Sequence, residues 1–313
     1  MEDKSMTIAN FNIVFGEKEE PLLDYFDTVL LPAFNSSLIR SKGDSEYILM
    51  NIKVSEISKD DFVITGIIVK KTVLEVFTKF DEQENFIKTK EYHPTAPFSV
   101  FIIYLKNHRM ILVRNQKGSP NILTFSATVK YIMNKYIHDE NRKRKRDNIQ
   151  YLPYPIINIV GIPIKESIEE ALKKVKKINK LTLKLYPLNG DIDFSGFFDT
   201  MSTDLRKAVD SKTGALTLNS PNSVSGITEV LTAAEGTIEP IISVTYPDKS
   251  NGKIYNGSLS ENMKIQYDDT DIDTVTSVII SKTKDLKSIK NVSDGNQQIY
   301  SKNLNKIKPF KDN

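Results

Sequence analysis

The chain has 313 residues, of which 39% are hydrophobic and 27% are charged, and its formal net charge is +3. This length supports a sizeable hydrophobic core and lies near the size at which one core gives way to two. The sequence contains no cysteine, which excludes disulfides, thiolate zinc sites and a cysteine nucleophile.

The hydropathy of the chain argues against a membrane protein. Its apolar stretches, such as residues 98–105, are much shorter than the ~20 residues that span a bilayer. The first residues lack the basic start and apolar run of a signal peptide. We therefore expect a cytoplasmic protein with no membrane insertion of its own.

The first half of the sequence predicts a β-rich part with two helices. Apolar alternation indicates strands, and proline near a first turn indicates helix starts. The predicted strands cover residues 7–15, 46–55, 61–71, 72–80, 98–105 and 110–115. One helix follows Pro21, and a second follows Ser119 as its cap with Pro120 at its first position. The basic residues 138–150 are expected to form a solvated loop or a helix extension.

The second half predicts strands and helices in alternation. Strands are expected over residues 151–161, 181–188, 215–219, 238–246 and 264–267, the last two as an antiparallel pair. Helices are expected over residues 167–180, 194–209 and 222–235. The fold class predicted is α+β, with two mixed domains and mainly antiparallel strands. We place an N-terminal domain at 1–145, a C-terminal domain at 146–285 and a flexible tail at 286–313.

Positive charge is concentrated in one segment. Residues 104–184 contain 18 Lys or Arg and 6 Asp or Glu, whereas the whole chain carries a net charge of only +3. Such an asymmetry points to a polyanionic partner, most simply nucleic acid. Whether the cations of this segment share one surface decides how much weight that inference carries.

Three cationic elements make up the candidate nucleic-acid-binding set. They are a hairpin with its returning strand, a run of five cations, and the lysine-rich face of a helix. The residues are Lys106, His108, Arg109, Arg114, Lys117, Arg142, Lys143, Arg144, Lys145, Arg146, Lys173, Lys174 and Lys177. Cations that neutralise phosphates give salt-sensitive binding that does not depend on base sequence, and a ribbon tip can reach into a groove. Ordinary solvated surface is the alternative interpretation of each element.

Aromatic residues flank the basic segment. Tyr104, Tyr151 and Tyr154 could stack on bases or could belong to the core, which is the commoner fate of such residues. The motif from Lys117 to Pro120 lacks the glycine spacing of a phosphate-binding loop. It therefore indicates a helix cap.

Evidence for catalysis or for a metal is sparse. The three histidines, His93, His108 and His138, share no ligand spacing. Two groups of acidic residues could in principle hold Mg²⁺ as in a nuclease; they are Asp191 and Asp193, and Asp268, Asp269, Asp271 and Asp273. Acidic turns explain both groups equally well. We therefore predict no catalytic residues, no metal and no cofactor.

Two segments resemble a group of phage-defence proteins. They are residues 96–101, which lead into the hairpin, and residues 181–193, an apolar strand that ends in a proline and runs into a charged segment. The order of these features is similar to that in RexA-like and Kiwa-type DNA-binding proteins of bacterial phage defence. This resemblance implies DNA binding as a cytoplasmic homodimer or other homo-oligomer, and a partner protein encoded in the same defence operon.

The resulting hypothesis is a non-enzymatic protein that binds nucleic acid, DNA rather than RNA, mainly through the backbone. Two alternatives remain open at this stage. One is a metal-dependent nuclease or phosphoryl-transfer effector built on the aspartates. The other is a protein–protein adaptor whose positive segment meets an acidic partner.

Overall fold

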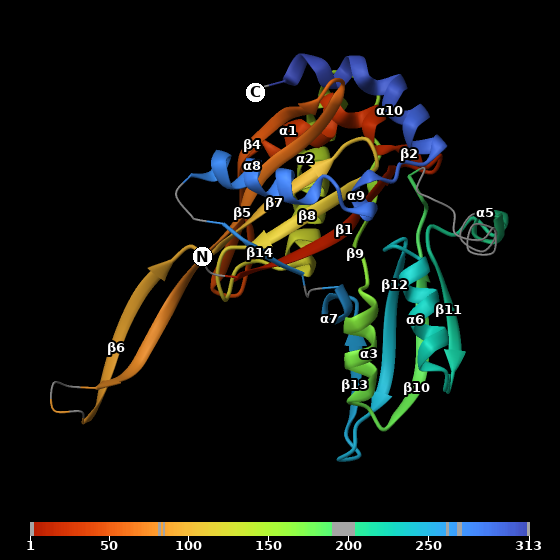
Figure 1. Ribbon diagram of the computed structural model, residues 1–313. Coiled ribbons are helices and arrows are strands. Elements are labelled where there is room, and N and C mark those ends of the chain that lie inside the picture. The colour runs from red at the N-terminus through yellow and green to blue at the C-terminus, as the bar shows by residue number, and fades with distance from the viewer. Residues whose placement is uncertain are drawn as a thin grey trace.

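A computed structural model of the chain describes residues 3–80, 83, 85–189, 204–260, 263–267 and 271–311, and it contains two separate β-sheets (Figure 1). All ladders between the described strands are antiparallel. The predicted α+β class is therefore confirmed.

The larger sheet has the strand order β14-β1-β8-β7-β5-β4-β3, with β2 and β9 also paired to β1 and β6 paired to β5. Its strands are β1 (Asp3–Phe15), β2 (Glu20–Pro21), β3 (Arg40–Lys42), β4 (Ser45–Ser58), β5 (Asp61–Phe80), β6 (Phe86–Thr95), β7 (Phe98–Tyr104), β8 (Arg109–Arg114), β9 (Pro155–Gly161) and β14 (Met263–Gln266). The central strand β1 pairs with β8 from Met6↔Val113 to Asn10↔Arg109.

Helices cover both faces of the larger sheet, which explains why its strands β1, β7 and β8 are buried on both sides. Phe11 and Phe15 of β1 belong to one core, and Met6 and Ile8 belong to the other. This division follows the two-residue period of a strand. The first core also contains residues from η1 (Leu22–Tyr25), η2 (Phe26–Leu30), α1 (Leu31–Phe34), α2 (Ile122–Arg146) and α10 (Asp294–Ile307). The second contains residues from α8 (Ile272–Thr283) and α9 (Lys287–Lys290).

The smaller sheet has the order β11-β10-β12-β13 and its own core. Its strands are β10 (Lys177–Leu185), β11 (Gly214–Asn219), β12 (Ile238–Thr245) and β13 (Asn251–Tyr255). The core includes residues of α3 (Lys165–Lys173), α6 (Val224–Ala233) and α7 (Gly257–Ser260). The short helices α5 (Arg206–Ala208) and η4 (Lys308–Phe310) complete the described elements.

The division of the chain differs from the sequence-based one. Strand β9 pairs with β1 from Ala9↔Gly161 to Phe15↔Pro155, and β14 also pairs with β1. A boundary after residue 145 therefore separates strands of the same sheet. The smaller sheet lies in the sequence between two strands of the larger one.

The prediction of a flexible C-terminal tail is wrong for the described residues up to 311. Helix α10 is capped by the Ser293 side chain, and its Tyr300 and Ile307 are buried. The Tyr300 hydroxyl accepts a hydrogen bond from the Phe62 amide at 3.0 Å and donates one to the Asp60 carbonyl at 3.0 Å. A few well-spaced apolar residues thus anchor a segment whose composition is polar.

Several predicted boundaries need correction. The predicted helix over 167–180 ends at Lys173, and the Lys176 amide then donates to the Thr245 carbonyl as the chain enters β10. The two strands expected at 61–71 and 72–80 are one strand, β5, and its hairpin partner β6 is not among the strands expected from the sequence. Strand β14 pairs with β1, whereas β12 pairs with β13, so the expected pairing of 238–246 with 264–267 is wrong.

Candidate nucleic-acid interface

The basic run at Arg142–Arg146 forms the last turns of α2. Because the N–H of Ile149 donates to the Arg144 carbonyl at 2.9 Å, the helix closes in the manner of a Schellman motif. Asn148 has a φ of 55° at the position where such motifs favour glycine or asparagine. Cations in the last turn also complement the helix dipole. The predicted helix extension is therefore the correct alternative, although Asn121 rather than Ser119 caps the start of α2.

The chain after α2 returns alongside the helix end. The side chain of Asn141 donates to the Leu152 carbonyl at 2.9 Å and accepts from the Leu152 amide at 2.7 Å. Leu152 is buried, whereas its neighbour Tyr151 is 55% exposed and Tyr154 is 49% exposed. The two tyrosines are thus held at the surface on the segment that returns along the helix end. We call Arg142–Arg146, Tyr151 and Tyr154 together the helix-end patch.

Few acidic groups neutralise the helix-end patch. Lys143 pairs with Glu140 at 3.0 Å, and Arg144 donates to the Gln150 carbonyl at 2.9 Å. Arg142, Lys145 and Arg146 are exposed, and none of them forms an ion pair with another residue that the structure describes. Three cations are therefore available to an external anion.

The hairpin tip between β7 and β8 is inside the protein. His108 is 0% exposed and Arg109 is 2% exposed, which overturns the prediction that they reach toward a groove. The Arg109 guanidinium donates to the Glu235 carboxylate at 3.0 Å and to the Glu235 carbonyl at 2.9 Å. A nitrogen of the His108 ring lies 3.0 Å from the side-chain oxygen of Asn296. These side chains connect the larger sheet to the smaller unit and to α10.

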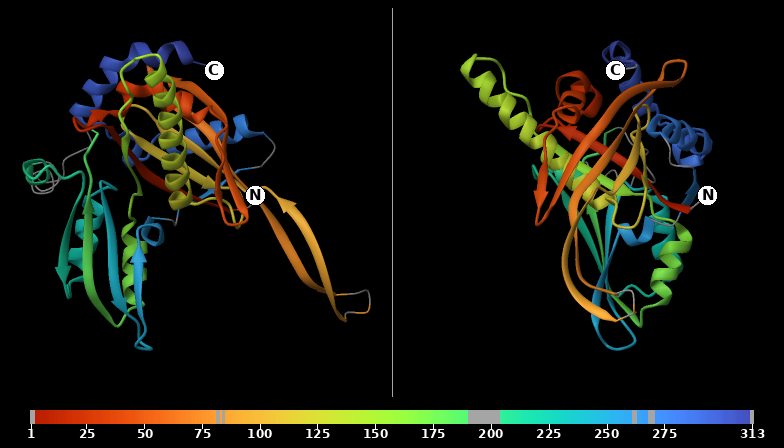
Figure 2. Two further views of the ribbon diagram at one scale, coloured as in Figure 1. Left: turned by 180° about the vertical axis from the view of Figure 1, so that it is seen from behind. Right: turned by 90° about the vertical axis from the view of Figure 1, so that its left-hand side faces the viewer.

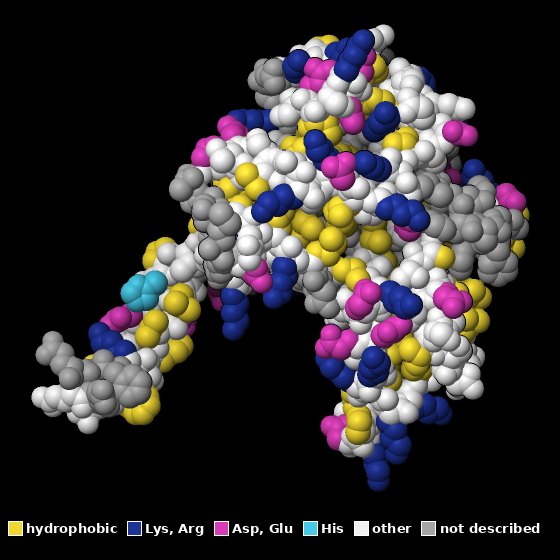
Figure 3. Space-filling model, viewed as in Figure 1, with side chains coloured by type: hydrophobic (Ala, Val, Ile, Leu, Met, Phe, Trp, Pro, Cys, Tyr) yellow, Lys and Arg dark blue, Asp and Glu magenta, His cyan; other side chains and the backbone are white. Residues whose placement is uncertain are grey.

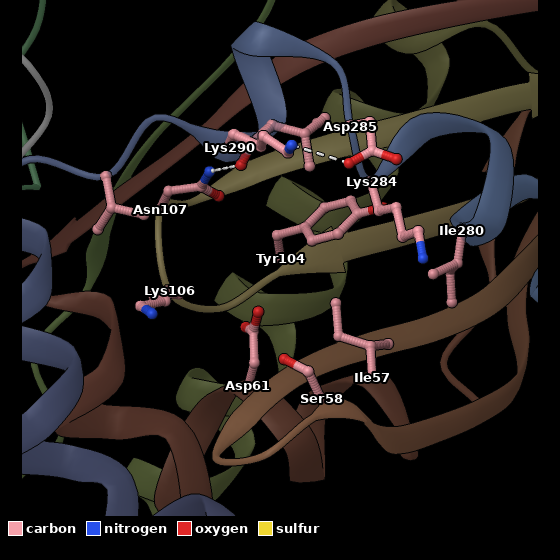
Figure 4. A pocket seen from close by; sticks show the side chains of 12 residues that line it. Ile57, Ser58, Asp61, Tyr104, Lys106, Asn107, Ile280, Lys284, Asp285 and Lys290 are labelled. Carbon is pink, nitrogen blue, oxygen red and sulfur yellow. Dashed lines mark hydrogen bonds and ion pairs between the residues drawn. The ribbon is translucent and has the colours of Figure 1, made fainter.

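The remaining cations near the hairpin lie in separate places. Lys117 is exposed in the turn before α2, and Arg114 is partly buried at the end of β8. Lys106 lines a cavity of about 350 Å³ together with Asp61 and Tyr104 (Figure 4). The hairpin therefore presents no continuous cationic surface.

The cavity beside Lys106 is small and mixed in charge. Burial raises the pKa of the Asp61 carboxyl, against the opposing influence of the Lys106 charge and a hydrogen bond from Ser58. Burial also raises the pKa of Tyr104. Asp285 and Lys290, which pair with each other at 2.8 Å, and Lys284 also line the cavity. The lining therefore mixes three lysines with two aspartates and is not a concentrated cationic site.

The lysines expected on a helix are at the other end of the molecule. Lys173 is the last residue of α3, Lys174 pairs with Glu170 at 2.7 Å, and Lys177 begins β10. In both views of Figure 2 the end of α3 lies at the bottom, whereas the end of α2 lies at the top, and in the right-hand view it projects away from the rest of the protein. The three cationic elements therefore do not share one surface.

Two of the aspartates that could in principle hold a metal have ordinary structural roles. Asp271 caps α8 by accepting from the Thr274 amide, which lowers the pKa of the Asp271 carboxyl. Asp273 pairs with Lys53 at 2.6 Å. Asp191, Asp193, Asp268 and Asp269 lie outside the described residues. Within the described part of the chain, no group of three or more His, Cys, Asp or Glu side chains could hold a metal ion.

Comparisons with family models and with curated proteins add no relative. No protein-family model matches the chain, and no curated protein matches it. Among the helices of the described residues, none combines the length and apolar character needed to cross a membrane.

Proposed function

We propose that this protein binds nucleic acid without cleaving it, and that the helix-end patch makes the contacts. The observation that carries the proposal is the placement of Arg142, Lys145 and Arg146, exposed and outside any described ion pair, beside two exposed tyrosines. Cations supply the phosphate contacts, and tyrosine rings supply stacking surfaces that accept any base.

The interface is smaller than the sequence alone predicts. His108 and Arg109 are buried, and Lys173, Lys174 and Lys177 are on a distant surface. A patch of three available cations gives modest affinity that weakens as salt rises. The two tyrosines favour flexible single strands, whose bases can unstack onto aromatic rings.

The polymer proposed is DNA rather than RNA. The RexA-like and Kiwa-type resemblance implies DNA and a setting in phage defence, with a partner protein. We propose DNA on that basis. The helix-end patch itself does not distinguish the two polymers, because it would contact phosphates and base faces, which DNA and RNA share.

The test is a fluorescence-anisotropy titration of the full chain against single- and double-stranded DNA and RNA at two salt concentrations. Replacing Arg142, Lys145 and Arg146 together by Gln should weaken binding to every sequence. The matched control replaces Lys173, Lys174 and Lys177 by Gln, which removes the same charge from the distant surface. Equal losses in the two triple variants, or binding unchanged in both, would contradict the proposal.

The same titration with Mg²⁺ or Mn²⁺ added tests the non-catalytic part of the proposal. Intact polymer after prolonged incubation is the expected result. Cleavage that disappears on replacing Asp191 and Asp193 by Ala would overturn it in favour of a nuclease.

A further inference from the structure

The cavity beside Lys106 lies where separate segments of the chain meet (Figure 4). Its walls come from the β4–β5 and β7–β8 hairpins, the end of α8 and the residues in and after α9. Ile57, Tyr104 and Ile280 supply apolar surface, and the volume of about 350 Å³ is typical of a site for a small molecule. Over α8 and α9, Figure 3 shows lysine and acidic side chains intermixed with hydrophobic ones.

Three charged side chains in the lining have no opposite charge in contact with them. Asp61 and Lys106 are partly buried and Lys284 is exposed, and none of the three forms an ion pair with another residue that the structure describes. The Asp61 carboxylate takes its hydrogen bond from Ser58. Because a charge held partly out of water is costly without a partner, this lining favours a ligand that supplies the missing charges.

Hydrogen bonds between the walls hold the cavity in shape. The amide of Leu105 donates to the Phe62 carbonyl at 3.1 Å, which joins the hairpin that carries Lys106 to the strand that begins at Asp61. The side chain of Asn107 donates to the Ile289 carbonyl and, at 3.2 Å, to the Asn291 carbonyl. The site is thus formed before a ligand enters, so binding has a small ordering cost.

The arrangement of the unpaired charges indicates the chemistry of the ligand. In Figure 4, Lys106 and Lys284 lie on opposite sides of Asp61. Lys106 is close enough to Asp61 for its charge to act on the carboxyl. Asp285 and Lys290 neutralise each other, so two lysines and one aspartate leave a charge of +1. A complementary ligand has two anionic groups, one of them beside an ammonium, and a net charge of −1, which describes an acidic α-amino acid.

We propose that this cavity binds an acidic amino acid of the glutamate type. The α-carboxylate meets Lys106, the neighbouring ammonium meets Asp61, and the side-chain carboxylate meets Lys284. The methylene groups of the ligand lie against the ring of Tyr104. The proposal is independent of nucleic-acid binding, because the helix-end patch contributes no residue to this lining.

The first test is isothermal titration calorimetry of the full-length protein with L-glutamate and three analogues that each change one group. Glutarate lacks the ammonium, 4-aminobutyrate lacks the α-carboxylate, and L-glutamine replaces the side-chain carboxylate by an amide. Each analogue should bind about tenfold more weakly than L-glutamate, because it loses one charge-assisted contact. The shift in Tm with each ligand is a second readout.

Two results of this titration would overturn the proposal. One is neither heat nor a shift in Tm at L-glutamate concentrations up to ~10 mM. The other is equal affinity for L-glutamate and glutarate, which would describe a simple dicarboxylate site in which Asp61 has no part.

The second test matches each contact with one variant. Asp61→Asn should remove the preference for L-glutamate over glutarate, Lys106→Gln the preference over 4-aminobutyrate, and Lys284→Gln the preference over L-glutamine. Each variant should keep the other two preferences. Loss of the fold cannot give this crossed pattern, since it would weaken all four ligands together. A pattern in which every variant weakens all four ligands equally would contradict the assigned contacts.

The matched control is Lys117→Gln, which removes the same charge from an exposed turn outside the cavity. All four affinities should stay at their wild-type values in this variant, and circular dichroism shows that each variant is folded. If Lys117→Gln weakened L-glutamate as much as Lys106→Gln does, the effect would be one of net charge, and the proposed contact with Lys106 would be wrong.

Discussion

The hairpin tip and the helix-end patch carry similar side chains, yet they differ in what surrounds them. At the hairpin, Arg109 is 2% exposed and binds Glu235, a residue 126 positions away. At the helix end, Arg142 is exposed and forms no ion pair with another residue that the structure describes. The comparison shows that a cation counts toward binding an external polyanion only when the fold leaves it without an internal anion.

The largest difference in the free energy of unfolding should appear when one arginine in each region is replaced by alanine. Arg109→Ala leaves Glu235 unpaired in a partly buried position, so we expect a loss of about 3 kcal/mol in the free energy of unfolding. Arg142→Ala should change it by less than about 0.5 kcal/mol, because the side chain is exposed. Urea denaturation followed by circular dichroism measures both. Similar losses would show that the hairpin does not connect the two units as described.

Much of the fold follows from local sequence, and the misassignments have a common cause. Alternation in β1 and β7 and the apolar stripe of α2 report burial directly, so these elements were predicted. The environment of Arg109 depends on Glu235, and that of His108 depends on Asn296, and no local pattern reports either contact. The tail was misjudged because Tyr300 and Ile307 are few among polar residues, although their spacing is helical.

The candidate site was only partly predictable for the same reason. The run Arg142–Arg146 is visible in the sequence, but its separation from Lys173 and Lys177 depends on the arrangement of two sheets. The exposure of Tyr151 and Tyr154 depends on the clamp between Asn141 and Leu152. Strand β6 is not among the strands expected from the sequence because Pro94 interrupts its pattern, although proline is tolerated on an open-edged strand.

An effect of intermediate size should come from the tyrosines of the helix-end patch. Replacing Tyr151 and Tyr154 by Ala should weaken binding of single strands by about 1–3 kcal/mol for each base that stacks. Binding of duplex should change less, because its bases are already stacked. Anisotropy with both substrates measures the difference, and Tyr255→Ala, at a 47% exposed position on β13, is the control. Equal losses for single strands and duplex would argue against stacking.

The smallest effect should be a pH dependence at the hairpin cavity. Burial raises the pKa of the Asp61 carboxyl above its ordinary value of 3.8. The folded protein therefore holds the proton on Asp61 more tightly than the unfolded chain does. Stability from this group is therefore lost as pH rises through the interval between the two values. Asp61→Asn should be more stable than the wild type at neutral pH, and the advantage should shrink below about pH 4. Denaturant titrations at several pH values measure it, and an advantage that grows on acidification would contradict the assignment.

The salt dependence of single-stranded DNA binding tests the central claim most directly. Each phosphate contact contributes about 0.7 to the slope of log affinity against log salt. Replacing Arg142, Lys145 and Arg146 by Gln should therefore reduce the slope by about 2 relative to the wild type. The variant with Lys173, Lys174 and Lys177 replaced should keep the wild-type slope. A slope reduced equally in both variants, or reduced only in the second, would show that the helix-end patch is not the nucleic-acid interface.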